Sequence, residues 1–356
     1  HYLIKKYHFE EKKLEKIERA LTPLGKIFVK PMDSKKHTFE KTDSQIQLKQ
    51  FKSKQTTYLE ASFIENEMSP QQAMATMMLH LKEKVDFKKV THVELYVQNM
   101  DDFKDINNVY TQFFSFYPPS RVCCAIKGVH QIRIRMFIEA DHKPDHVLHV
   151  QSLSKWAPAC IGPYSQATSS RNLIRLAGQI GFIPDTMNLV EREQQREQTV
   201  KNVDAVLNFF NTTYDKSNLY QNIVYGDKHS TMEELFIDIP FTEYYRAETL
   251  PRQASIEIHT GAIHKDATQI IETITMGSIH GFHIRVVNDE QPQYHTYWFK
   301  YQKTEDLSVE DIKSFMDNQK YSYIRSNDER VISTFTSCIR MPEGIQQELY
   351  LVIVSL

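Results

Sequence analysis

Glycine is scarce in this sequence. It has 10 glycines in 356 residues, and they form no cluster of the kind that wraps a phosphate group. A nucleotide-binding loop needs several closely spaced glycines, because only they let the backbone approach the phosphates. The chain therefore lacks the loop that an adenylating or dinucleotide-binding domain requires, and we expect no cofactor in it.

Strong net charge and long hydrophobic runs are missing as well. The formal net charge is −2 at pH 7, so no basic surface of the size that nucleic acids require is expected. No stretch resembles a signal peptide or a transmembrane segment. We expect a cytoplasmic protein with no nucleic-acid partner and no membrane partner.

Cysteine is also rare, with four residues at Cys123, Cys124, Cys160 and Cys338. None has the C-x-x-C spacing, and two adjacent cysteines in a strand point to opposite faces, so reduced thiols are expected. The chain begins with His1 rather than methionine, and we expect it to be a piece of a longer protein.

The patterns that are present predict an α+β fold with antiparallel-rich sheets and helices packed on one face. The first unit reads strand, strand, helix, strand, helix, strand, strand. Its expected strands are Gln45–Phe51, Thr56–Ile64, Val90–Val97, Arg121–Gly128 and Gln131–Ala140, and its helices follow Ser69 and span Phe103–Phe114.

The same order recurs after about 130 residues, which is too long for a solenoid repeat and indicates a second domain. Its expected elements are the strand Asn172–Ile183, the helix Glu193–Phe210, the strand Tyr220–Tyr225, an irregular acidic section Asp227–Leu250, and the strands Gln253–Thr260 and Thr268–Met276.

The last part is less regular. Strands are expected at His283–Val287, Tyr294–Tyr301, Val331–Ile339 and Gln347–Val354, with a helix at Ser308–Met316. It is either a truncated third copy, which we favour, or an extension that covers a sheet edge. The expected organisation is a connecting segment 1–40, a first unit 41–150, a second unit 151–280 and a C-terminal extension 281–356.

Three histidines, His142, His146 and His149, lie close together near the end of the first unit. Two histidines four residues apart on a helix are a zinc-ligand pattern. Pro144 interrupts the run and no cysteine complements it, so an interdomain linker is expected rather than a metal site.

The segment Ile161–Ala167 reads I-G-P-Y-S-Q-A and precedes a strand that contains Gly178 and Gln179. Gly-Pro forces a turn that presents Tyr164, and a glycine inside an apolar strand leaves room for a ligand or another backbone. A hairpin with a packing glycine is the plainer interpretation. The two motifs together resemble the opening signature of the reactive-intermediate deaminase family (RidA, YjgF, L-PSP).

That resemblance implies chorismate-mutase-like α+β domains that form trimers, with ligand sites in the clefts between neighbours. It also implies pairing of domains within this chain and leaves the oligomeric state open. In such proteins an arginine at the position of Arg121 holds the carboxylate of an imino or keto acid, because a guanidinium matches a carboxylate in a bidentate way. Cys123 lies on the same face. Arg252 is expected at the equivalent place in the second unit.

Deaminases of this family carry a glutamate that positions the hydrolytic water. Counting back along the last strand of each unit places Phe137 and Ile270 there, so we expect water activation to be lost in both units. We assign no catalytic residue. One composite cleft could survive, with Tyr164, Gly178 and Gln179 facing Arg121 and Cys123, and it would bind a small carboxylate or carbonyl ligand.

Degenerate tandem domains of this family resemble the C-terminal half of fungal diphthine–ammonia ligases. The resemblance implies an ATP-dependent domain that lies upstream of this chain, with elongation factor 2 as the partner of the whole protein. This chain would then be an accessory module. The alternatives are a stand-alone deaminase of imines or enamines, an enzyme that acts on a carbonyl through Cys123, and a module for oligomerisation.

Overall fold

The computed structural model describes residues 46–355, apart from 54, 65–66, 115–116, 215–217, 227–236, 238–240, 289–290, 303–306, 319–322, 336 and 342–347. The chain divides into two units, 1–38 and 39–356, and the described residues belong to the second. The connecting segment expected over 1–40 lies outside them. No helix in the described part of the chain has the length and apolarity needed to span a bilayer.

The first sheet follows the predicted element order. Helix α3 begins where Ser69 accepts a hydrogen bond from the backbone N–H of Gln72, with Pro70 in the first turn. Its methionine-rich face is buried in the core between the helices and the sheet. The elements are β1 (Ile46–Lys52), β2 (Thr56–Phe63), α3 (Pro70–Lys82), β3 (Val90–Val97), α4 (Phe103–Tyr110), β4 (Ser120–Ala125) and β5 (His130–Glu139).

The second sheet differs from the prediction at its end. The section expected to be irregular contains the edge strand β10, and the expected linker contributes the short strand β6. Only the first part of Asn172–Ile183 is a strand. The elements are β6 (His146–Leu148), β7 (Ala167–Ser170), β8 (Leu173–Leu176), α5 (Gln195–Asn208), β9 (Asn218–Tyr225), β10 (Thr242–Arg246) and β11 (Ile256–Ile263).

The third sheet takes in a strand that was predicted for the second. Strand β12 pairs along its whole length with β13, so Thr268–Met276 is not the last strand of the second sheet. The strand predicted at Val331–Ile339 is wrong in its first half, because Asp328 caps a helix there by accepting from the backbone N–H of Arg330. The elements are β12 (Thr268–Met276), β13 (Ile279–Asn288), β14 (Gln291–Gln302), α8 (Val309–Asp317), β15 (Tyr323–Ser326), α9 (Glu329–Thr334), β16 (Cys338–Arg340) and β17 (Glu348–Ser355).

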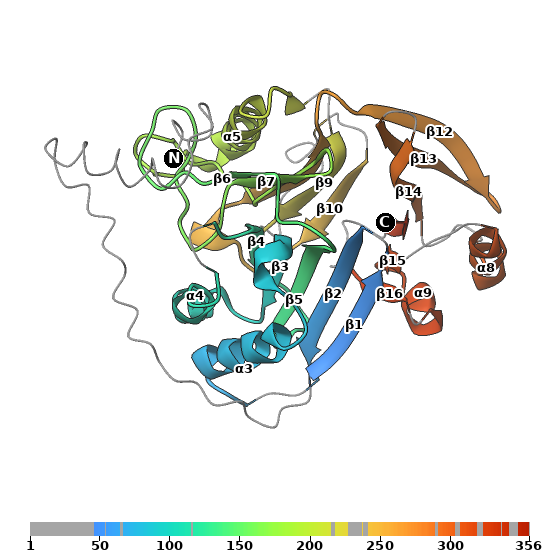
Figure 1. The fold of residues 1–356 in the computed structure, drawn as a ribbon, viewed down its shortest axis with the longest axis horizontal. Coiled ribbons are helices and arrows are strands. Elements are labelled where there is room, and N and C mark those ends of the chain that lie inside the picture. Colours follow the sequence, from blue (N-terminus) through green and yellow to red (C-terminus); the bar gives the residue numbers. More distant parts are fainter. Residues whose placement is uncertain are drawn as a thin grey trace, which may run out of the picture. The chain divides into compact units, whose positions relative to one another are not determined.

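The three sheets of the described residues share one connectivity (Figure 1). In each sheet an antiparallel hairpin is followed by a helix and then by a third strand. A fourth strand pairs parallel to the third at the edge of the sheet. The fifth strand returns to lie between the hairpin and the third strand. The spatial orders are β1-β2-β5-β3-β4, β7-β8-β11-β9-β10 and β13-β14-β17-β15-β16, with β6 and β12 added at the outer edges.

The parallel edge strand of each sheet contacts another sheet: that of the first sheet contacts the second, that of the second contacts the third, and that of the third contacts the first. Strand β4 forms an isolated β-bridge at Ser120 with Ser165, which lies just before β7 of the second sheet. On β10, the backbone N–H of Tyr244 donates to the hydroxyl of Tyr350 in the third sheet. The carbonyl of Cys338 on β16 accepts from Lys49 Nζ of the first sheet at 2.7 Å. An aromatic and aliphatic cluster with members in all three sheets, among them Tyr58, Phe137 and Tyr323, fills the space where they meet.

Candidate functional site

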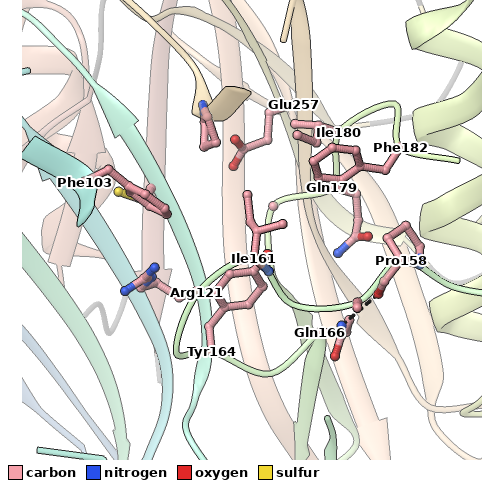
Figure 2. Close-up of a pocket in the computed structure, with 14 residues that line it drawn as sticks. Phe103, Arg121, Pro158, Ile161, Tyr164, Gln166, Gln179, Ile180, Phe182 and Glu257 are labelled. Carbon is pink, nitrogen blue, oxygen red and sulfur yellow. Dashed lines mark hydrogen bonds between the residues drawn. The ribbon is translucent and has the colours of Figure 1, made fainter. Parts of the chain in front are cut away.

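A pocket lies where β4 of the first sheet meets β11 of the second sheet and the segment that follows β8. It encloses about 510 Å³ of empty space, including the solvent at its mouth. Figure 2 shows Arg121 with Phe103 and Tyr164 on one side and Phe182 with Pro158 on the other. The lining residues are Phe103, Arg121, Cys123, Pro158, Ala159, Ile161, Tyr164, Gln166, Gly178, Gln179, Ile180, Phe182, Pro251 and Glu257.

Backbone hydrogen bonds join the two sides of the pocket. The N–H of Gly178 donates to the carbonyl of Arg121 at 3.2 Å, and the N–H of Ser165 donates to the carbonyl of Pro119 at 3.1 Å. The hydroxyl of Ser165 donates to the carbonyl of Pro118 at 2.6 Å. The relative position of Arg121 and the Tyr164 turn is therefore set by the main chain rather than by flexible side chains.

Arg121 is a buried cation without an anion. Arg121 is 2% exposed, and its side-chain atoms Nε, Nη1 and Nη2 have no hydrogen-bond partner among the described residues. The guanidinium instead faces three aromatic rings, Tyr110 at 4.7 Å, Tyr164 at 5.4 Å and Phe103 at 5.7 Å. Cation–π contacts compensate a buried charge only in part. The arrangement suits a ligand that supplies a carboxylate.

Two glycines make room for the charged groups of the pocket. A Cβ on Gly162 would lie 3.0 Å from Arg121 Nη2, and a Cβ on Gly178 would lie 1.7 Å from Glu257 Oε1. The second contact is far shorter than two heavy atoms allow. Gly178 is therefore required for the carboxyl group of Glu257 to occupy its place.

Glu257 is the acidic residue among those that line the pocket. It lies on β11 and is 3% exposed. Burial raises its pKa to about 8, and the charge of Arg121 offsets only part of this effect. No hydrogen bond or ion pair to another described residue holds the carboxyl group. A carboxyl with a pKa near neutrality can both give and take a proton, which is the property of a general acid–base catalyst.

Glu257 overturns the expectation that the pocket has lost its acid. The count that led to Ile270 started from Glu272, but both residues lie on β12 in the third sheet. The central return strand of the second sheet is β11, and Glu257 lies there. The error arose because Thr268–Met276 was taken as the last strand of the second unit, and a strand-like pattern alone does not identify the sheet to which a strand belongs. Phe137, the position counted in the first unit, packs on Tyr58 and is absent from the pocket lining.

Five of the six expected ligand-binding residues line this one pocket, namely Arg121, Cys123, Tyr164, Gly178 and Gln179. Arg252 does not. It lies exposed in a short 3₁₀ turn (Pro251–Gln253) with φ of 59°, while its neighbour Pro251 reaches the pocket. The strand that corresponds to β4 in the second sheet is β10, and it starts at Thr242.

Cys123 is a poor nucleophile in this environment. Burial raises the pKa of its thiol to about 12, although Arg121 acts in the opposite direction. The thiolate is the reactive form, so almost none of it is present at neutral pH. The geometry gives no support to covalent chemistry on a carbonyl through Cys123.

The helix face beneath Arg121 was missed from the sequence. Phe103, Asn107 and Tyr110 follow one another at i, i+4 and i+7 on α4, and the side-chain oxygen of Asn107 is buried without a hydrogen-bond partner among the described residues. The amide nitrogen of Asn107 lies 3.4 Å from the position of a Cβ on Gly162. This spacing was a signal that the three side chains share a face.

Among the described residues, two groups have metal-ligand chemistry, but neither is free for a cation. Arg171 binds Glu139 at 2.9 Å and also Asp141, beside His142. In the buried group His92, Glu94 and His259, the carboxylate already accepts from Arg135 and from Tyr96. The positive charges of Arg175 and Arg325 also act on these histidines. Neighbouring guanidinium groups disfavour a second cation at both places.

A buried arginine and a buried glutamate of raised pKa line one pocket between the first and second sheets. The family model described as endoribonuclease L-PSP matches residues 154–264. A RutC family protein of Aquifex aeolicus is 31% identical over 118 residues, which cover 30% of this chain and 93% of that protein. The chain belongs to the endoribonuclease L-PSP (RidA) family.

Two fungal proteins named diphthine–ammonia ligase are also similar to it. That of Schizosaccharomyces pombe is 42% identical over 104 residues and that of Saccharomyces cerevisiae 30% over 120 residues. These segments are 29% and 28% of this chain but only 17% and 18% of the ligases. Among solved structures, the Rid family protein YyfA of Yersinia pestis is 34% identical, with 32% of this chain and 97% of that protein covered and a TM-score of 0.29.

Proposed function

We propose that the pocket binds a small 2-imino acid and that Glu257 catalyses its hydrolysis to the 2-oxo acid and ammonia. The observation that carries this proposal is the pairing of an uncompensated buried guanidinium, Arg121, with a carboxyl group of raised pKa in one pocket. A mouse protein named 2-iminobutanoate/2-iminopropanoate deaminase is 29% identical to this chain, with 85% of its length covered.

The roles follow from the chemistry of the groups. Arg121 holds the substrate carboxylate, and the aromatic rings around it keep water away from the guanidinium. Glu257 takes a proton from water as the oxygen bonds to the imine carbon, and passes it to the nitrogen as the C=N π bond opens. It then takes the hydroxyl proton of the resulting carbinolamine and gives it to the nitrogen as the carbon–nitrogen bond breaks and ammonia leaves. Its pKa of about 8 suits both transfers near neutral pH.

The test uses 2-iminobutanoate, formed in the cuvette from 2-aminobutanoate by an amino-acid oxidase, with removal of the imine as the signal. Arg121→Ala and Glu257→Gln should each lower kcat/KM about a hundred-fold or more, because each removes a group that acts in the transition state. Arg252→Ala is the matched control, since Arg252 is exposed outside the pocket, and its activity should equal that of the wild type. Binding of 2-oxobutanoate without turnover would reduce the proposal to ligand binding.

A second candidate concerns the whole protein. We propose that this chain is the RidA-like region of a diphthine–ammonia ligase that modifies elongation factor 2, with the ATP-dependent step in a domain outside this chain. The identity of 42% and 30% to two fungal ligases favours it. The region would then bind a ligand or partner, or handle ammonia. The two candidates are compatible, because imine hydrolysis releases ammonia.

The whole-protein candidate is tested with the full-length protein in cells that lack their own ligase. Diphthamide on elongation factor 2 is measured after introducing Arg121→Ala, Glu257→Gln or Arg252→Ala. Loss of diphthamide with Arg121→Ala and Glu257→Gln, but not with Arg252→Ala, would show that amidation requires the pocket. Normal diphthamide with all three, combined with loss when residues 41–356 are removed, would leave an assembly role. Normal diphthamide after that removal would reject the candidate.

A further inference from the structure

The side of the pocket that lies away from Arg121 is apolar. Ile180 and Phe182 line it together with Pro158, and Figure 2 shows them across the pocket from the arginine. Both side chains are buried and belong to one apolar cluster, against which Ile161 also packs. We call Ile180 and Phe182 the apolar wall. An acid that Arg121 holds by its carboxylate extends its side chain toward this wall.

The backbone of the apolar wall depends on one side chain of α5. The wall follows the end of β8, where the sheet no longer supplies every carbonyl group with a donor. Asn202 takes over this role, because its Nδ2 donates to the carbonyl of Ile180 and to that of Phe182, both at 2.9 Å. Asn202 is 1% exposed, and it does not line the pocket itself.

Two further contacts fix this arrangement. Gln198 Nε2 donates to Asn202 Oδ1 at 3.0 Å, so the nitrogen of the Asn202 amide is the atom that faces the two carbonyls. Gly181 lies between the two wall residues, and a Cβ there would stand 3.0 Å from the Cα of Gln195 on α5. The helix therefore approaches the wall closely and holds it by a side chain with a defined orientation.

We propose that Asn202 is the positioning residue for the side-chain end of the pocket, and that the wall it holds makes the pocket select 2-imino acids with an apolar side chain. This inference rests on the proposed hydrolysis. Without the two amide donors, the carbonyls of Ile180 and Phe182 must turn toward other partners, because a buried carbonyl that lacks a hydrogen bond costs free energy. Turning a carbonyl moves the side chains beside it. Arg121 and Glu257 lie on β4 and β11 and keep their places.

The test uses two substrates that differ only in the side chain. An amino-acid oxidase forms 2-imino-4-methylpentanoate from leucine and 2-iminopropanoate from alanine, and calorimetry gives the Kd of the two matching 2-oxo acids. The variant is Asn202→Leu, which keeps a similar size and removes the donors. Thr199→Val is the matched control, since Thr199 is also buried on α5 but its hydroxyl donates within the helix, to the carbonyl of Gln195 at 2.6 Å. Thermal unfolding is measured for each protein.

The wild type should favour the larger acid about ten-fold or more, in kcat/KM and in Kd, because each methylene buried on an apolar wall adds to binding. Asn202→Leu should reduce both preferences about five-fold or more while the values for the three-carbon acid change less than about three-fold. Thr199→Val should keep both preferences. Gln198→Met alters a half-buried side chain and should shift them in the same direction by about two-fold, which provides the test where Asn202→Leu does not fold.

Equal losses with both substrates in Asn202→Leu would overturn the inference, because general damage to the pocket does not select between side chains. A wild type without preference for the larger acid would overturn it as well. The ratio of the two Kd values tests the wall without any turnover. A wild type that binds both oxo acids and hydrolyses neither imine therefore overturns the proposed hydrolysis and not the role of Asn202.

Discussion

Gly178 and Glu257 lie so close together that any side chain at position 178 must displace the glutamate: a Cβ there would stand 1.7 Å from Glu257 Oε1. Gly178 follows β8 and Glu257 lies on β11, and the atoms that a Cβ would meet belong to the Glu257 side chain, so the carboxyl group rather than the backbone would shift. The carboxyl group of Glu257 occupies the space that a side chain would take, directly beside Arg121's strand. The glycine and the glutamate are therefore a single structural unit.

Gly178→Ala tests this unit. The added methyl group should displace the Glu257 carboxyl and lower both the melting temperature and imine hydrolysis. In the double variant Gly178→Ala with Glu257→Ala the methyl group finds space, so the melting temperature should recover relative to Gly178→Ala while activity does not. Additive losses of stability in the two single variants would show that the residues do not interact.

The stability of the protein should fall as pH rises through the window set by Glu257. Its pKa is about 8 in the folded protein and 4.5 as an ordinary glutamate, so the unfolded chain releases this proton first. The free energy of unfolding therefore falls by about 1.4 kcal/mol for each pH unit between these two pKa values. Above the higher pKa the contribution of Glu257 no longer changes with pH. Glu257→Gln removes the contribution of Glu257, while the contribution of Glu243, whose pKa burial also raises to about 8, remains in both proteins. Urea unfolding of both proteins at pH 5, 6.5 and 8 measures the difference, and equal slopes would contradict it.

Ligand affinity should depend on the same proton. Above a pH of about 8 the ionised Glu257 places a negative charge in the pocket that we propose binds the substrate carboxylate. The Kd of 2-oxobutanoate should therefore rise with pH in the wild type and stay level in Glu257→Gln. Calorimetric titrations between pH 6.5 and 9 provide the check. A rise of equal size in both proteins would assign the effect to another group.

Tyr110 contributes to the pocket through its ring and not through its hydroxyl. The hydroxyl is buried without a hydrogen-bond partner among the described residues, whereas the ring centroid lies 4.7 Å from the Arg121 guanidinium carbon. Tyr110→Phe should leave 2-oxobutanoate binding unchanged. Tyr110→Leu should weaken it by about 0.5–2 kcal/mol, because the cation–π contact orients the guanidinium. Equal affinities of the two variants for 2-oxobutanoate would show that the ring of Tyr110 does not contribute to binding.

Arg135 should be one of the most sensitive positions for stability. It is 2% exposed, binds Glu60 at 2.6 Å and Glu94 at 3.1 Å, and donates to the carbonyl of Arg340 in the third sheet. Arg135→Met leaves two buried carboxylates without a cation, which costs about 3–5 kcal/mol. The exposed pair Glu197 and Lys201 is the control, since Lys201→Met should cost less than about 1 kcal/mol. Denaturant unfolding compares them.

The fold could be predicted from local periodicity where one face of an element is buried. Helix α3 and the strands of the first sheet match their predicted ranges within a few residues for this reason. Local sequence patterns did not predict the fold where a strand could pair with more than one neighbouring strand. Nothing in the alternation of Thr268–Met276 distinguishes pairing with β13 from pairing within the second sheet. The helix after Asp328 had a capping signal that the β-branched residues Val331 and Ile332 outweighed.

The site was predictable in part for a related reason. Arg121 and Tyr164 carry motifs that can be read along the chain, and the hypothesis of a composite cleft brought them together. Glu257 has no such motif, and its importance arises from a strand order that only the structure gives. The signal that remained was chemical: Glu257 stands between Ile256 and Ile258 in a predicted strand, and the structure shows that every residue of this strand is buried.

The docking of β4, β10 and β16 on the following sheets has a practical consequence for handling the protein. A parallel edge strand presents unpaired backbone groups that recruit other chains when nothing covers them. Cutting the chain after any one sheet would uncover such an edge, so shortened fragments should aggregate even though each sheet has its own core. Physical studies of this region are best served by keeping all three sheets on one polypeptide.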